Sequence, residues 1–170
     1  MEDAVQRLER MIEQDSENAR LPFRCGVLLM QIDHQRLSNF AKAQEHFEKA
    51  VSLDPEFADA HYHLGVVMQV QTRYIESIVP LEKAVALDPA KPNAQFHLAM
   101  AYLRAGRTEN AQGCLERVLE LDPTHTGAMQ HLHDLEQAEE NLLKRVSYFP
   151  NDLREVELID AVEEHLLDPE

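Results

Sequence analysis

Histidine is the side chain with the most chemistry to offer in this sequence, with nine copies among 170 residues. His63, His97 and His131 recur at a constant spacing of 34 residues. Imidazole changes charge near neutral pH and also ligates metals, so the column has three interpretations: a strip that becomes cationic as pH falls, a metal site, or flat polar residues along a groove wall. We expect the last. His61 and His63, like His131 and His133, are two residues apart and would point to different helix faces, so neither pair is expected to chelate a metal.

No group of residues in the sequence is typical of catalysis. Five glycines provide no phosphate-binding loop, and Gly26, Gly65 and Gly106 are expected at helix contacts or turns. Serine, histidine and aspartate occur, but no nucleophile motif presents them. Carboxylates such as Glu109 and Glu116 fall on expected helix surfaces. We therefore expect no enzymatic activity, no cofactor and no metal.

The elements that would position the histidines repeat with the same period. The tripeptide Leu-Asp-Pro ends at Pro55, Pro89 and Pro123, and each proline is expected to end a helix. Upstream, one column holds the large apolar residues Phe47, Leu81 and Leu115, and another holds the small residues Ala43, Ser77 and Ala111. In the preceding helix of each unit, Leu64 matches Leu98 and Gly65 matches Ala99. This period indicates stacked two-helix units in which small residues allow close helix packing.

The pattern resembles the tetratricopeptide repeat family: a leucine beside a small residue in the first helix, then alanine, an aromatic residue or leucine, and alanine in the second. The resemblance covers roughly residues 1–137 and is most typical from His63 to Pro89. It implies an all-α fold, an α-solenoid of helix-turn-helix repeats with N- and C-terminal capping helices. It also implies a concave groove that binds a protein or peptide partner.

The predicted domain organisation follows from the repeat columns. A tetratricopeptide repeat domain is expected over residues 1–146, with eight helices over 3–145. It comprises a half repeat (3–18), repeats at about 19–57, 58–91 and 92–125, and a capping helix (126–145). In the half repeat, Ala4, Leu8 and Met11 take the places of Ala43, Phe47 and Ala50. Near the other end, His133 occupies a small-residue place and Glu136 an apolar one, so the array is expected to end there with Glu136 facing water.

Two local departures from the period are also visible. About five extra residues, Asp33 to Leu37, enlarge the turn of the first repeat, and we interpret them as a surface loop. Pro80 lies inside an expected helix from about Arg73 to Ala86 and is expected to bend it locally.

Three columns of the first helices are expected to face the groove. They run Phe23, Tyr62, Phe96, Gln130; Val27, Val66, Met100, Asp134; and Met30, Gln69, Leu103. The predicted partner-binding set also includes Arg24, His63, Asn93, His97 and His131. An aromatic and aliphatic floor favours an apolar helix or an extended peptide as ligand. The alternative is that neighbouring helices or the C-terminal helix partly cover these residues.

One well-known use of the family is not expected here. Members that hold the C-terminal carboxylates of cytosolic heat-shock chaperones place Lys, Asn, Asn, Lys and Arg at particular groove columns. The corresponding places hold Phe23, Val27, His63, Asn93 and His97. Without paired cations, nothing grips two carboxylates.

Residues 147–170 are predicted to form an acidic amphipathic C-terminal helix after the break at Pro150. Leu153, Val156, Ile159, Val162 and Leu166 recur every three or four residues, while Glu155, Asp160, Glu163 and Glu164 lie on an acidic face. Packing against the preceding helix is favoured, and the alternatives are the chain's own groove or another copy.

Composition favours a soluble, cytoplasmic protein. The formal net charge is −15, with −9 in residues 134–170, −4 in 1–17 and −2 in 18–133. This acidity argues against nucleic acid and anionic membranes as partners. No signal peptide and no membrane-spanning stretch is expected, and Cys25 and Cys114 are expected to be buried and unpaired. We interpret the chain as a protein-binding adaptor or assembly module; the alternatives are a scaffold that self-associates through the C-terminal helix and a chaperone for a secreted or complex-forming client.

Overall fold

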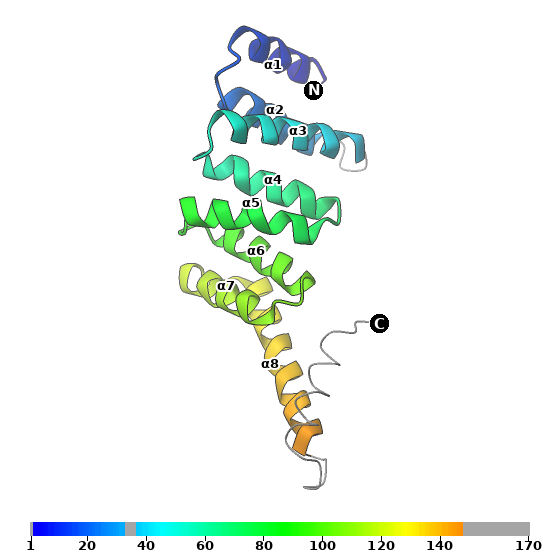
Figure 1. Ribbon diagram of the computed structural model, residues 1–170, viewed down its shortest axis with the longest axis vertical. Coiled ribbons are helices and arrows are strands. Elements are labelled where there is room, and N and C mark those ends of the chain that lie inside the picture. Colours follow the sequence, from blue (N-terminus) through cyan, green and yellow to red (C-terminus); the bar gives the residue numbers. More distant parts are fainter. Residues whose placement is uncertain (1, 33–36, 148–170) are drawn as a thin grey trace. The chain divides into compact units, whose positions relative to one another are not determined.

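The computed structural model describes residues 2–32 and 37–147, and every regular element in these residues is an α-helix. The helices are α1 (Glu2–Gln14), α2 (Arg20–Gln31), α3 (Leu37–Leu53), α4 (Ala58–Val70), α5 (Tyr74–Leu87), α6 (Pro92–Arg104), α7 (Thr108–Leu121) and α8 (Thr126–Ser147), as Figure 1 shows. The predicted all-α fold is confirmed. The expected loop insertion falls largely, and the C-terminal helix beyond Pro150 entirely, outside the described residues.

The chain divides into two compact units, residues 1–125 with α1 to α7 and residues 126–170 with α8. In the first unit, α2 packs on α3, α4 on α5 and α6 on α7, as antiparallel pairs (Figure 1). Each pair also contacts the next, through α3 with α4 and α5 with α6, and the first helices α4 and α6 touch directly. Helices α2, α4 and α6 therefore present one face, which we call the first-helix face.

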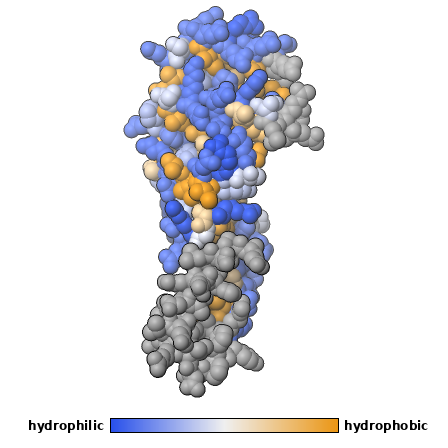
Figure 2. All heavy atoms as spheres, turned by 45° about the vertical axis from the view of Figure 1, so that its right-hand side comes forward, coloured by the Kyte–Doolittle hydropathy of each residue, from blue (hydrophilic) through white to orange (hydrophobic). Residues whose placement is uncertain are grey.

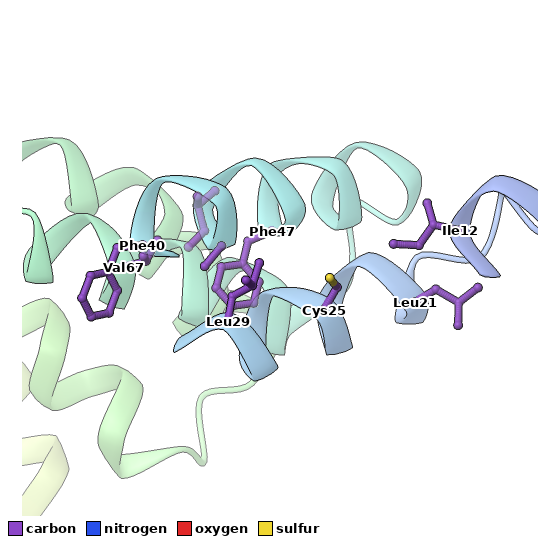
Figure 3. Packing of buried hydrophobic residues seen from close by; sticks show 9 residues of the cluster. Ile12, Leu21, Cys25, Leu29, Phe40, Phe47 and Val67 are labelled. Carbon is purple, nitrogen blue, oxygen red and sulfur yellow. The ribbon is translucent and has the colours of Figure 1, made fainter. Parts of the chain in front are cut away.

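The core is built from the repeated columns. Phe47, Leu81 and Leu115 have no exposed surface, and neither do the small residues Ala43, Ser77 and Ala111. Figure 3 shows Phe47 in one buried cluster with Leu29 and Cys25 of α2. In the first two pairs, the large side chain of the second helix packs on the small residue of the first helix: a Cβ on Gly65 would lie 2.4 Å from Cγ of Leu81, and a Cβ on Gly26 would lie 2.7 Å from Cε1 of Phe47. The predicted close helix contact at Gly65 is thus confirmed, and Ala99 is fully buried.

Helix α1 packs with a different register from the one its sequence columns indicated. Met11 was placed in the column of the fully buried Ala50, yet it is 39% exposed, and Ile12 is buried instead. Val5 and Leu8 also pack against the core, so the inner stripe is residues 5, 8 and 12. The reason is that α1 stands at the end of the stack and contacts only α2 among its neighbours with substantial packing.

The Leu-Asp-Pro tripeptides form the turns between units. The carboxylates of Asp54, Asp88 and Asp122 each accept a hydrogen bond from the backbone N–H two residues later, at 3.1, 3.3 and 3.0 Å. Aspartate thereby satisfies a donor at the point where proline ends the helix. The invariant tripeptide is explained by turn geometry.

A second kind of turn joins the two helices within a unit. Thr72 has φ 65° and Gly106 has φ 70°, and these residues lie 34 positions apart. In both turns the next residue donates a backbone hydrogen bond to the helix end, Arg73 to Met68 and Arg107 to Tyr102, each at 2.9 Å. This is the Schellman arrangement of a helix C-terminus, which requires a left-handed residue.

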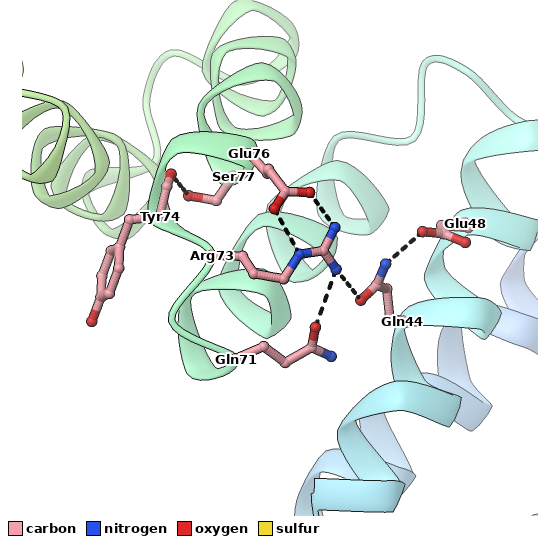
Figure 4. A network of polar contacts seen from close by, with 7 residues as sticks. All are labelled: Gln44, Glu48, Gln71, Arg73, Tyr74, Glu76 and Ser77. Carbon is pink, nitrogen blue, oxygen red and sulfur yellow. Dashed lines mark hydrogen bonds and ion pairs between the residues drawn. The ribbon is translucent and has the colours of Figure 1, made fainter.

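Arg73, next to the left-handed Thr72, ties the middle repeat to the first. Its guanidinium pairs with Glu76 on its own helix and donates to Gln44 Oε1 of α3 at 3.1 Å and to Gln71 Oε1 at 3.3 Å (Figure 4). Gln44 in turn donates to Glu48 at 2.7 Å. Because the contact is on the surface, it contributes little to the free energy of unfolding. Its effect is to hold the two repeats in a defined geometry.

Helix α5 runs without interruption from Tyr74 to Leu87 with the buried Pro80 inside it. The local bend predicted there stays a prediction. In the second unit, His133 and Glu136 of α8 are exposed, as expected for the end of an array.

Candidate functional site

A row of rings runs along the first-helix face. Seven rings follow one another in contact, and we call this row the ring strip: Phe57, Phe23, His63, Tyr62, His97, Phe96 and His125. From Phe23 to His125 the successive centroid distances are 5.2, 5.0, 5.7, 6.2 and 4.6 Å, with Phe57 beside Phe23 at 4.8 Å. The strip crosses α2, α4 and α6 and ends just before α8. Most pairs are tilted or edge-to-face, the arrangements that aromatic rings prefer.

Three members of this surface were missed by the sequence reasoning. Phe57, Lys91 and His125 each stand two residues after the proline of a repeat, at the entrance to a first helix. The same 34-residue period that aligned the helices would have aligned them too. They were overlooked because they precede the helices whose columns were compared.

His97 is held in a fixed orientation by Gln69 of the neighbouring helix α4. The Gln69 amide donates to the backbone oxygen of His97 at 2.7 Å, and Gln69 Oε1 accepts from His97 Nδ1, also at 2.7 Å. The neutral imidazole therefore carries its proton on Nδ1, which leaves Nε2 as an acceptor. Gln69 was expected on the groove floor, but it is only 7% exposed. Its side chain positions His97 instead of facing a ligand.

His63 is fixed in a similar way within its own helix. Its Nδ1 donates to the backbone oxygen of Asp59 at 2.8 Å. The carboxylate of Asp59 forms an ion pair with Lys91, whose Nζ lies 4.9 Å from the ring centroid of Tyr62. Lys91 thus combines an ion pair with a cation–π contact at the middle of the strip.

Burial disfavours the protonated form of these two histidines. Loss of solvation lowers the pKa of His63, and the nearby charge of Lys91 also lowers it. The hydrogen bond to the Asp59 backbone oxygen acts in the opposite direction and raises this pKa. Loss of solvation, and then the charge of His63, lowers the pKa of His97. His63 and His97 therefore gain charge at a lower pH than an exposed imidazole does. His131, the third member of the column, lies on α8 in the second unit.

A shallow hollow of about 260 Å³ opens at the α2 end of the strip. Its walls are Phe23, Val27 and Leu28 of α2 with Leu8 of α1, and Arg24 and Gln31 supply the polar groups. Arg24 is exposed. The hollow therefore offers an apolar seat with one guanidinium at its side.

The other predicted groove residues are placed as follows. Val66, Met100 and Leu103 are partly buried and Asn93 is exposed. Tyr62, His63, Phe96 and His97 are also partly buried rather than enclosed. Phe23, Val27 and Met30 pack against the core cluster, so part of their surface serves folding. Figure 2 shows apolar side chains reaching the surface between hydrophilic ones on the side it presents. Their use as a binding surface remains a prediction.

A possible nucleophile pair has the wrong chemistry for catalysis. Cys25 Sγ lies 3.4 Å from Nε2 of His46, a distance that a thiol–imidazole pair would need. However, Cys25 is fully buried and loss of solvation raises the pKa of its thiol to about 11. Burial likewise raises the pKa of the partly buried Cys114 to about 11. Both sulfurs remain protonated and free of disulfides.

Within residues 2–32 and 37–147, no three histidine, cysteine or acidic side chains come together as metal ligands would. The helices of this part of the chain also include none with the length and apolarity to cross a bilayer.

Antiparallel helix pairs stacked in one direction, with the same columns buried in each pair, define a helical-repeat solenoid. The sequence agrees with this class, because a tetratricopeptide repeat model matches residues 71–135 and a TPR repeat model matches residues 36–71. The chain belongs to the tetratricopeptide repeat family. No curated protein matches the sequence.

Solved structures share the fold at low sequence identity. MamA 41-end from Desulfovibrio magneticus RS-1 is 23% identical with a TM-score of 0.72, over 86% of this chain and 80% of that one. Another structure, described as MamA protein, is 22% identical with a TM-score of 0.68, over 89% and 87%. The first TPR of Spaghetti (RPAP3) bound to the HSP90 peptide SRMEEVD is 20% identical with a TM-score of 0.65, over 72% and 93%. At this level of sequence identity, the likeness to these structures shows the fold alone.

Proposed function

We propose that this chain is a non-catalytic adaptor or assembly module that holds a partner peptide or helix on its first-helix face. The observation that carries the proposal is the ring strip, an unbroken row of seven aromatic and imidazole rings. Partly buried rings provide large contact area at little entropic cost, which is typical of residues that dominate binding energies. The strip spans all three helix pairs, as a groove for an extended partner must.

The family supports this function by analogy. The Spaghetti (RPAP3) domain shares the fold and is bound to a peptide in its structure. The same peptide is not proposed for this chain, because Phe23, His63 and His97 stand where the chaperone-binding members of the family carry cations or an amide. We infer a partner whose contacts are mainly apolar and aromatic. Its cellular setting, proposed as cytoplasmic, follows from composition.

The test is affinity capture with the full chain in lysate of its own host. Phe96→Ala removes the ring next to the last one of the strip, and we expect it to reduce recovery of the specific partner at least about tenfold. Val79→Ala is the matched control, because this apolar side chain is 71% exposed on α5, away from the strip. Circular dichroism and urea unfolding verify that both variants fold. Equal recovery by the wild type and a folded Phe96→Ala variant would show that the strip is not the binding surface.

A further inference from the structure

We propose that the ring strip of one chain receives the acidic segment 151–170 of a second copy. This deepens the proposed function and rests on it, because the same face would hold the partner. Three features carry the proposal: complementary charge, complementary apolar spacing, and the length of α8.

The three helices that carry the ring strip have, taken together, the opposite charge to the segment. Helices α2, α4 and α6 carry three arginines, Arg20, Arg24 and Arg104, against one acidic residue, Asp59, a net charge of +2. Among the other described helices, α3 is neutral and α1, α5, α7 and α8 are negative. Residues 148–170 contain eight acidic residues and one arginine, a net charge of −7. In a chain with a net charge of −15, helices α2, α4 and α6 are therefore a distinctive place for this segment to dock.

Two cations stand at the strip itself. Arg24 adjoins the hollow beside Phe23 and Val27, and Lys91 lies over the ring of Tyr62. Lys91 is paired with Asp59 on the same chain. Arg24 is exposed at the hollow, where a carboxylate of the segment can meet it.

The apolar pattern of the segment suits a row of rings. Leu153, Val156, Ile159, Val162 and Leu166 recur at helical spacing, which predicts a single apolar stripe. A helix of these residues would be roughly 20 Å long. The ring strip comprises five successive ring contacts of 4.6 to 6.2 Å, so ring surface continues from α2 to the start of α8. This is the helix-in-groove mode of recognition.

Chain length favours a second copy over the same chain. Helix α8 has 22 residues and is therefore about 33 Å long, whatever direction it takes. The four residues 148–151 reach back at most about 14 Å. The segment of the same chain would therefore begin at least about 19 Å from the start of α8, which follows the last ring of the strip, His125, whereas the segment of a second copy is not restrained in this way. Packing on α8 would instead bring the segment against a helix that is itself negative, with a net charge of −2.

Sedimentation of the full chain over a range of about 1 to 200 µM tests the proposal. The wild type is expected to self-associate within that range, and Ile159→Glu, which places a charge in the apolar stripe, is expected to weaken association at least about tenfold. Val79→Glu is the matched control: the same type of change on an exposed apolar residue of α5, expected to leave association unchanged. A wild type that stays monomeric, or an Ile159→Glu chain that associates normally, would overturn the proposal.

A mixing experiment identifies which surfaces meet. Phe96→Ala damages the strip and keeps the segment, whereas Ile159→Glu damages the segment and keeps the strip. Each variant alone is expected to be monomeric, while a mixture is expected to form a complex through the intact strip of one and the intact segment of the other. Arg24→Glu, at an exposed side chain, replaces Phe96→Ala if that variant proves unstable. The proposal is contradicted if Ile159→Glu forms no complex either with Phe96→Ala or with Arg24→Glu.

The same variants separate this proposal from the proposed function. Ile159→Glu and the double variant Ile159→Glu/Phe96→Ala are both tested for capture of an outside partner. If only Ile159→Glu captures it, the strip binds other proteins, independently of whether it also binds the segment. The self-association data then decide the further proposal alone.

Discussion

Thr72 and Gly106 show how one backbone requirement is met by two very different residues. Both have positive φ at equivalent turns, and Gly106 meets no atom within 4 Å at its Cβ position. A β-branched residue in this region costs about 1–2 kcal/mol, whereas glycine pays only its extra entropy in the unfolded chain. The middle repeat therefore carries a strain that the next repeat lacks.

Substitutions at these turns should change stability in opposite directions. Thr72→Gly is expected to raise the free energy of unfolding by up to about 1 kcal/mol, and Gly106→Ala to lower it by about 1 kcal/mol. Gly113→Ala provides the comparison, because Gly113 lies inside α7 with open space around it and should gain about 0.5–1 kcal/mol. Urea unfolding measures all three. A destabilised Thr72→Gly would show that the threonine side chain makes a contact worth more than its strain.

The buried histidines make stability depend on pH. Loss of solvation is the main cause that lowers the pKa of His46, His63 and His97 from the ordinary value of 6.5. The folded chain then binds fewer protons than the unfolded chain, so the free energy of unfolding rises with pH in this window. It should be highest above about pH 6.5 and fall as the pH drops toward the folded-state pKa values. Urea unfolding at pH 7.5, 6.5 and 5.5 measures this slope, and His97→Gln should reduce it; an unchanged slope would argue against His97 as a source.

At the scale of the helix pair, close packing of a small residue against a large one sets the position of each helix. A Cβ on Gly65 would approach Cγ of Leu81 to 2.4 Å, and a Cβ on Gly26 would approach Cε1 of Phe47 to 2.7 Å. Leu81 and Phe47 are fully buried and cannot move aside. These contacts fix the spacing between paired helices.

Gly65→Leu should therefore destabilise the chain by a few kcal/mol, through overpacking between α4 and α5. Gly113→Leu adds the same side chain to an exposed helix position and should cost little. The midpoint of urea unfolding distinguishes the two variants. Equal midpoints for Gly65→Leu and the wild type would mean that α4 and α5 can separate without loss, against the packing seen here.

At the scale of the whole molecule, removal of the acidic C-terminal segment distinguishes docking on a second copy from packing within the same chain. Truncation after Pro150 removes the segment that we propose to dock on a second copy. The truncated chain is expected to be monomeric, with a free energy of unfolding within about 0.5 kcal/mol of that of the wild-type monomer. Sedimentation and urea unfolding at low protein concentration measure both quantities. A monomeric parent that loses stability on truncation would instead indicate packing of the segment within its own chain, the arrangement that the sequence favoured.

The sequence by itself determined the fold, because a fixed 34-residue period in Leu-Asp-Pro, in Phe47, Leu81 and Leu115, and in the small residues allows only one way to bury all copies. It also predicted which helices share a face. Such information is periodic, so it fails where the repeat context ends: Met11 of α1 was assigned to the interior and is exposed.

Only the tertiary structure decided how the first-helix face is built. Gln69 reads as a surface residue in sequence, yet it is buried and orients His97 across the boundary between α4 and α6. The ring strip likewise depends on contacts between successive units, such as Tyr62 with His97 at 5.7 Å and Phe96 with His125 at 4.6 Å. A repeat pattern specifies which residues are equivalent, but ring contacts, ion pairs and pKa shifts depend on distances between units. Those distances are set by the packing of whole helices, which no single column of residues encodes.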